Sequence, residues 1–167
     1  MVFMLEAVPE IEIHPATLAD VDLIVQMTFS AMGKHLEMAF GGGFDWGGWE
    51  TDIRGVILRN KREEGIIETF ITKQKKIVGF WWITPHLDHL WIDAIVLNEN
   101  HRNGGIGSWL LKNFDQIFSD LYPANKNIQL GVQKTNQAAV RFYERLGFQE
   151  IPDEFMELHN TLHLVKK

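Results

Sequence analysis

The sequence contains no cysteine among its 167 residues. This absence excludes disulfides, metal sites built on thiolates and any covalent intermediate carried on a thiol. Basic residues are also few, because 16 lysines and arginines against 22 aspartates and glutamates give a formal net charge of -6. Duplex nucleic acid is bound through a basic face, so this balance argues against a nucleic-acid-binding protein.

Long apolar runs and an export signal are missing as well. No stretch approaches the roughly 20 apolar residues that a membrane span needs. The first ten residues, MVFMLEAVPE, carry two acids and a proline and have no basic region, which is not typical of a secretion signal. We therefore expect a cytoplasmic protein with no membrane partner.

Hydrophobic periodicity predicts a single α/β domain over residues 1–167, with a mixed central sheet flanked by helices. Strands are expected at 11–14, 66–72, 76–84, 90–97, 128–132, 148–151 and 162–165. Helices are expected at 18–32, 49–64, 106–121 and 137–146. The glycine-rich segment 40–50 is expected to contain no regular element, and a polar loop should join the last two strands. In the strand 76–84, side-chain alternation should place Phe80 and Trp82 on one face and Trp81 on the other.

Three glycines and an arginine occupy residues 101–108, HRNGGIGS, between an expected strand and an expected helix. Glycines at such a junction allow several backbone N–H groups to converge on an anion at the helix N-terminus. A dinucleotide-binding fingerprint would need glycine where Leu110 stands, and the Walker Gly-Lys-Ser/Thr sequence does not occur. On these residues alone, a phosphate cradle and a plain tight turn both remain open.

Two segments together resemble a known family. Residues 102–107, RNGGIG, fit the pattern R-x-x-G-x-G/A, and residues 132–148, VQKTNQAAVRFYERLGF, contain an asparagine, a tyrosine seven positions later and a closing Leu-Gly-Phe. In this order, with one helix between them, they resemble the GNAT superfamily of N-acetyltransferases. The resemblance covers residues 76–150, whereas residues 1–65 match only in the order strand-helix-helix. It implies the GNAT-like acyl-CoA N-acyltransferase fold, with acetyl-CoA as cosubstrate.

The resemblance also assigns cofactor-binding residues. Backbone amides of about 103–108 would hold the CoA pyrophosphate, with added charge from Arg102, and the main chain of Leu97 would bond the pantetheine arm. CoA would lie between the strands 90–97 and 128–133, which would splay apart. Asn136 would bond the cofactor or cap its own helix, and Arg102 and Asn103 are also compatible with a solvated turn. The implied cofactor-binding residues are Leu97, Arg102, Asn103, Gly104, Gly105, Ile106, Gly107, Ser108, Asn136 and Tyr143.

Tyr143 and Asp93 are the candidate catalytic residues. By resemblance, Tyr143 would protonate the leaving thiolate, although its spacing also fits a core aromatic residue. Asp93 interrupts the apolar run LWIDAIVL, where a carboxylate is costly unless it is paired or faces a wet cleft. It is either the base that takes the amine proton, directly or through water, or a buried carboxylate with a structural hydrogen bond. Alternation predicts that Asp93 shares a face with Ile95 and Leu97, and Glu99 is a weaker candidate base.

The expected acceptor is a small molecule with a primary amine. In N-terminal acetyltransferases of ribosomal proteins, a glutamate stands where this chain has Gly131, so a peptide acceptor is disfavoured. The resemblance places segment 40–50 over the acceptor, where its aromatic side chains would form a wall and its acids would pair with the amine. The alternative is that the aromatic residues pack under a loop or at a dimer contact. The residues concerned are Phe40, Phe44, Asp45, Trp46, Trp49 and Glu50.

A metal centre is not expected. His86, Asp88 and His89 lie close together in a loop, but no third, remote ligand is evident and the implied chemistry needs no metal. Because no cysteine can hold the acetyl group, transfer is expected to be direct, within a ternary complex. The alternative is a non-catalytic CoA-binding or interaction module of the same fold. Similar proteins are frequently homodimers, so the resemblance also allows a homodimer here.

Overall fold

A computed structural model describes residues 10–121 and 127–167. Residues 1–9, on which the expectation about an export signal rests, lie outside that range. Within the described residues, the strands form one seven-stranded sheet in the order β1-β2-β3-β4-β5-β7-β6. These strands are β1 (Ile11–Pro15), β2 (Ile66–Thr72), β3 (Ile77–Pro85), β4 (His89–Leu97), β5 (Asn127–Gln133), β6 (Gln149–Ile151) and β7 (Thr161–Lys166). Neighbouring strands are antiparallel except β4 and β5, which are parallel, so the expected mixed sheet is confirmed.

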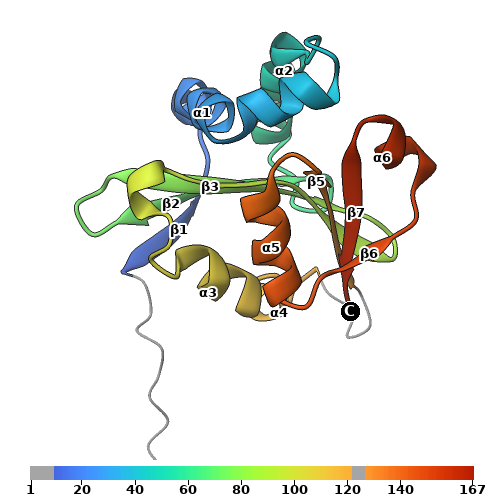
Figure 1. Cartoon of the computed structure of the whole chain (residues 1–167). Helices are drawn as coiled ribbons and strands as arrows, with labels where there is room; N and C mark the ends of the chain where they lie inside the picture. The colour runs from blue at the N-terminus through green and yellow to red at the C-terminus, as the bar shows by residue number, and fades with distance from the viewer. Residues whose placement is uncertain (1–9, 122–126) are drawn as a thin grey trace, which may run out of the picture.

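Helices cover both faces of the sheet (Figure 1). One face carries α1 (Val21–Ala39) and α2 (Trp46–Arg59). The other face carries α3 (Ile106–Lys112), α4 (Phe114–Ile117) and α5 (Gln137–Arg145). The remaining helical segments are α6 (Glu154–Leu158) between β6 and β7, and the 3-10 turns η1 (Leu18–Asp20) and η2 (Glu99–His101). None of the described helices is long and apolar enough to cross a membrane.

The core is divided by the sheet into two apolar clusters, and β3 contributes to both. Trp81 is fully buried in the cluster beneath α3, α4 and α5, where its ring contacts Phe114 and Phe118. Phe80 and Trp82 belong to the cluster beneath α1 and α2. The expected alternation of these three aromatic residues is therefore confirmed.

The structure differs from the expected helices on the α1–α2 side. α1 continues past Met32 to Ala39 because Leu36 extends its buried stripe. The expectation that segment 40–50 has no regular element is wrong, because α2 already begins at Trp46. Asp45 caps this helix by accepting a hydrogen bond from the Gly48 amide at 2.8 Å, and such a cap offsets part of the cost of helical glycine. α2 ends earlier than expected, since Asn60 adopts a left-handed conformation at φ 48°.

Two further segments also depart from expectation. The single helix expected over 106–121 is interrupted at Asn113, whose backbone leaves helical geometry and whose side chain donates to the Trp109 carbonyl at 2.8 Å. Asparagine forms such local bonds in competition with regular helix. The polar loop expected between the last two strands contains α6, which Asp153 caps through the Met156 amide at 3.1 Å.

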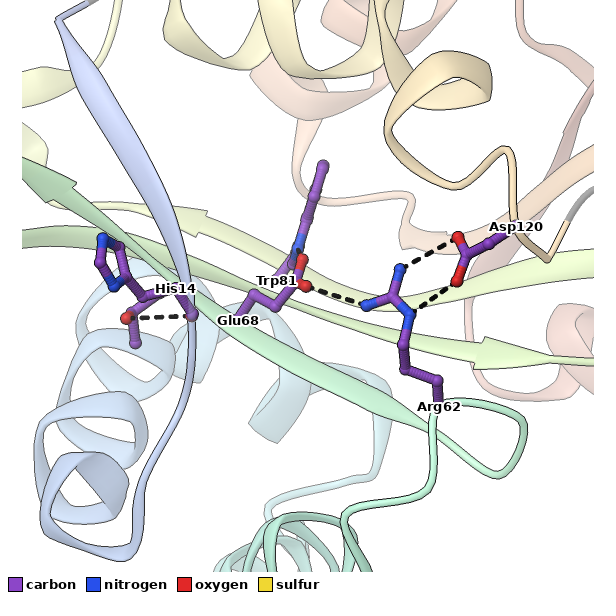
Figure 2. Close-up of polar contacts among 6 residues, drawn as sticks. His14, Arg62, Glu68, Trp81 and Asp120 are labelled. Carbon is purple, nitrogen blue, oxygen red and sulfur yellow. Dashed lines mark hydrogen bonds and ion pairs between the residues drawn. The ribbon is translucent and has the colours of Figure 1, made fainter.

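A polar network joins the loop after α2 to the opposite face of the sheet (Figure 2). Arg62 bonds to Asp120, beyond α4, and to Glu68 on β2 at 3.1 Å. Glu68 also accepts from the indole of Trp81 at 2.8 Å. Glu68 is buried, so these donors compensate the charge that folding removes from water. We assign this network a structural role.

Candidate active site

The parallel strands β4 and β5 separate partway along their length. Their register pairs residues 89–92 with 127–130 and ends at Ile92 opposite Leu130. Beyond that point, a cavity of about 540 Å³ lies between them, lined by residues 92–97 of β4 and 130–133 of β5. Backbone groups that would otherwise pair across the two strands are therefore available to a ligand. This geometry agrees with the expected splay.

The glycine junction forms one wall of this cavity, through Arg102, Asn103, Gly105, Gly107 and Ser108. Asn103 and Gly105 have left-handed backbones, at φ 60° and 85°. The first α-helical bond of α3 runs from the Trp109 amide to the Gly105 carbonyl, so the preceding amides have no acceptor within the helix. The turn thus presents backbone donors beside the cavity, as a cradle for an anion requires.

Gly107 allows α3 to approach its neighbours closely. A Cβ atom at this position would lie 3.1 Å from the ring of Phe142 on α5. Two cationic side chains, Arg102 and Arg145, also line the cavity. The junction therefore combines close packing, backbone donors and positive charge.

Arg102 lines the cavity and also bonds to the end of β4. Its Nε donates to the carbonyl oxygen of Leu97 at 2.9 Å. This main chain is the one expected to bond the pantetheine arm. A carbonyl oxygen has two lone pairs, so it can keep the Arg102 bond and accept a second one.

Asp93 lies at a β-bulge, which overturns one expectation about its direction. Trp82 pairs with Ala94 and the adjacent Ile83 pairs with Ile92, so Asp93 is the extra residue of β4. The bulge reverses the alternation: Ile95 packs with the α3–α5 cluster, whereas Ala94 belongs to the α1–α2 cluster. The expectation that Asp93 shares a face with Ile95 and Leu97 is therefore wrong.

Two observations show that the Asp93 side chain lies on the α1–α2 face. Its Oδ2 accepts a hydrogen bond from Oγ1 of Thr84 at 2.5 Å, and Thr84 follows Trp82 by two positions on β3. The charge of Asp52 on α2 also acts on Asp93. Burial raises the pKa of Asp93 to about 7, while the Thr84 hydrogen bond lowers it and Asp52 raises it further. A carboxyl group that titrates near neutral pH and lines a cavity is suited to proton transfer.

Tyr143 on α5 lines the cavity from the opposite face. The residue is 9% exposed, and its ring packs at 5.4 Å from Phe148. Burial raises the pKa of its phenol above the ordinary value, so the hydroxyl group keeps its proton at neutral pH. Tyr143 is thus a buried aromatic residue that adjoins the cavity and keeps its phenolic proton.

Asn136 and Gly131 are two further positions that the sequence singled out, and both line the cavity. The Asn136 side chain caps α5 by accepting from the Ala139 amide at 3.3 Å. Capping and contact with the cavity are therefore compatible. A Cβ atom at Gly131 would lie 3.3 Å from Thr161, so a larger side chain would require its neighbours to move.

The aromatic residues of segment 40–50 pack on one another and on rings of other elements. Phe44 contacts Phe40, Trp46 and Trp49 at ring-centroid distances of 5.5, 4.6 and 6.1 Å. Trp49 also packs on Trp82 at 4.9 Å. Among the described residues, the lining of the cavity includes none from this segment. These residues thus contact other rings, and their role as a wall for the acceptor stays a prediction.

α1 is the element that closes the cavity on that face, through Ala31 and Met32. One turn further, Nδ1 of His35 lies 2.8 Å from Oγ1 of Thr135, just before α5. Elsewhere, the rings of His86 and His89 stack at 4.5 Å, and Nδ1 of His89 lies 2.7 Å from Asp88. Glu99 is exposed in η2.

Sequence reasoning missed several residues of the site. These are Ala31, Met32, Thr84, Phe142 and Arg145. The contact between Thr84 and Asp93 depends on the bulge, which no local sequence pattern predicts. The positive charge of Arg145, which lies within the segment from Asn136 to Phe148, was a signal that could have identified it, because arginine binds phosphate groups.

Comparison with protein families and characterised relatives agrees with this geometry. Residues 35–148 match the model of the acetyltransferase (GNAT) family. The spermine/spermidine N(1)-acetyltransferase of Bacillus subtilis (strain 168) is 35% identical over 81 residues, which cover 44% of this chain and 53% of the relative. The match thus spans about half the length of that relative. The N-alpha-acetyltransferase of Sulfolobus acidocaldarius is 24% identical over 152 residues, or 84% of this chain and 80% of the relative.

Solved structures share the fold at low identity. The PaiA N-acetyltransferase of Thermoplasma acidophilum, solved with coenzyme A, has a TM-score of 0.71 at 15% identity, covering 94% of this chain and 98% of that one. A variant of spermidine N-acetyltransferase SpeG from Vibrio cholerae has a TM-score of 0.65 at 17% identity, covering 93% and 92%. The family model spans more than half of the chain, and the fold agrees with it. The chain therefore belongs to the acetyltransferase (GNAT) family.

Proposed function

We propose that this protein transfers the acetyl group of acetyl-CoA directly to a primary amine of a small molecule. The observation that carries the proposal is the cavity between the separated ends of β4 and β5. It brings the glycine junction and Asp93 together with Tyr143, which comes much later in the sequence. The two candidate proton-transfer residues therefore adjoin the same space as the candidate anion cradle.

The cofactor side of the cavity suits CoA. Backbone amides at the start of α3, together with Arg102 and Arg145, would hold its phosphates. The edge of β4 that faces β5 is unpaired beyond Ile92, and its main chain up to Leu97 would hydrogen-bond the amides of the pantetheine arm. Asn103, Gly104, Ile106, Ser108 and Asn136 complete the proposed cofactor-binding set. Acetyl-CoA supplies the acyl group and a thiolate leaving group.

Asp93 and Tyr143 carry the proposed proton transfers. Asp93 removes a proton from the ammonium group, directly or through water, so that the nitrogen lone pair can attack the thioester carbonyl carbon. A carbon–nitrogen bond forms and the carbon–sulfur bond breaks. Tyr143 gives its proton to the departing sulfur and regains one released from the nitrogen. Because the sequence has no cysteine, no acetyl-thiol intermediate on the protein is proposed.

Polyamines are the first acceptors to test. Two relatives are named as polyamine acetyltransferases, and a neighbouring structure is a spermidine N-acetyltransferase. In this chain, Asp93 and Asp52 place negative charge on the α1–α2 side of the site, which favours a cationic acceptor. At position 131 this chain has glycine and so lacks the carboxylate that is expected in enzymes acting on a peptide N-terminus.

The test is mass spectrometry of reactions containing acetyl-CoA and one amine at a time. Polyamines, amino acids, aminoglycosides and short peptides form the panel, and thiol release is followed in parallel. An acetylated amine with matching thiol release supports the proposal. CoA binding with neither product nor thiol release would instead favour a non-catalytic CoA-binding module, and no CoA binding would overturn both assignments.

A further inference from the structure

We infer that Thr84 is a positioning residue for the transfer reaction, which fixes the Asp93 carboxylate in the orientation that receives the proton of the acceptor amine. The inference rests on the proposed role of Asp93. Its basis is the contact between the two side chains across β3 and β4, at the bulge of β4.

The bulge creates the need for such a residue. A bulge residue lacks an opposite partner in the ladder, so regular strand alternation does not fix the direction of its side chain. Thr84 lies on β3 in register with Trp91, within the paired part of the sheet. Threonine is branched at Cβ and restricted at χ1, so its hydroxyl group provides a fixed donor for the Asp93 carboxylate.

The hydrogen bond gives the two carboxylate oxygens of Asp93 different roles. Oγ1 of Thr84 donates to Oδ2 of Asp93 at 2.5 Å, a short distance typical of a bond to a charged oxygen. Oδ1 is then the oxygen that takes the amine proton. Thr84 retains its own proton throughout, so the net change is movement of one proton from nitrogen to Asp93.

The same contact tunes the affinity of Asp93 for protons. A donor to the carboxylate stabilises the charged form and opposes the effect of burial. Among the described residues, Asp52 of α2 is the ionisable group that acts on Asp93, and it opposes Thr84. Removal of the hydroxyl group should therefore both loosen the carboxylate and raise its pKa.

The experiment compares Thr84→Val with Thr84→Ser and with a matched control, Thr69→Val. Val removes the hydroxyl group at similar volume, whereas Ser retains it. Thr69 is buried on the adjacent strand β2 and bonds to the His14 carbonyl, away from Asp93, so its replacement reports the general cost of losing a threonine hydroxyl group. For each variant, kcat, kcat/KM as a function of pH and CoA affinity are measured with the same amine.

Thr84→Val is expected to lower kcat about tenfold, as befits the loss of a hydrogen bond to a charged group. The acidic limb of its kcat/KM profile should move upward by about one pH unit, with CoA affinity unchanged. Thr84→Ser should restore most of both properties, and Thr69→Val should retain the wild-type profile. Carboxyl-carbon NMR of Asp93 provides a readout that is independent of turnover, because its titration midpoint should rise in Thr84→Val.

The outcomes separate this inference from the proposed function. If Thr84→Val shows the wild-type kcat, pH profile and Asp93 titration, Thr84 is not a positioning residue. If Asp93→Asn retains full activity, the proposed base is overturned instead. If Thr84→Val folds poorly, the Thr84→Ser profile decides, since a wild-type titration with a large loss of kcat would contradict the inference.

Discussion

The two sides of the cavity offer different chemistry. On the α3–α5 side, the lining includes backbone donors at the glycine junction, the cations Arg102 and Arg145, and Tyr143. On the α1–α2 side, it includes Asp93 and the apolar Ala31 and Met32. The first side is suited to a polyanion and the second to the proton chemistry of an amine. We therefore expect mutations of the glycine junction to affect mainly cofactor binding, and mutation of Asp93 to affect proton transfer. Tyr143 is the exception on the α3–α5 side, because its proposed role is also proton transfer.

The strongest test of this division is Asp93→Asn. It keeps the shape of the side chain and its acceptor oxygen for Thr84 but removes the base. We expect kcat to fall on the order of 1000-fold, within the range typical of general acid–base catalysis, while CoA affinity measured by calorimetry changes little. A comparable loss of CoA affinity would mean that the two sides do not act separately.

The same substitution should alter the pH dependence of stability. The folded-state pKa of Asp93 is about 7 against an ordinary value of 3.8, so between these values the folded protein holds a proton that the unfolded chain has lost. Through this group, stability falls as pH rises and stays reduced above pH 7. The advantage of Asp93→Asn over the wild type in unfolding free energy should thus grow by about 3 kcal/mol from pH 5 to pH 8.

Denaturant unfolding at several pH values provides this measurement. Glu99→Gln is a suitable control, since Glu99 is exposed outside the sheet. Its unfolding free energy should differ little from that of the wild type at every pH. If the unfolding free energies of Asp93→Asn and the wild type change in parallel with pH, burial does not raise the pKa of Asp93.

Tyr143→Phe tests the donor that the α3–α5 side contributes to the reaction. The ring remains packed against Phe148, so folding should be preserved while the proton for the departing thiolate is lost. We expect kcat to fall on the order of 100-fold, with a small change in CoA affinity. Phe148→Leu serves as a packing control, and unchanged turnover of Tyr143→Phe at saturating substrates would leave Tyr143 as a core residue.

The same division explains which features could be read from the sequence. The glycine junction and the segment from Asn136 to Phe148 are local patterns, whose turn, cap and helix geometry depend on adjacent residues. They indicated the family and the fold. The bulge at Asp93 and the start of α2 at Trp46 depend on contacts between distant segments. Period-two alternation consequently predicted the wrong face for Asp93, and glycine content predicted no helix where aromatic packing and the Asp45 cap support one.

The smallest expected effect concerns the glycine junction itself, where two adjacent glycines form a matched pair. Gly105 has φ 85°, whereas the backbone of Gly104 is not in the left-handed region. Gly105→Ala should therefore cost about 1 kcal/mol of stability and weaken CoA binding by distorting the first amides of α3. Gly104→Ala should be milder, because its Cβ atom would meet the nearest atom at an ordinary 3.8 Å. Thermal melting and calorimetry measure both quantities. If the two variants weaken CoA binding equally, side-chain bulk rather than backbone conformation governs this wall of the cavity.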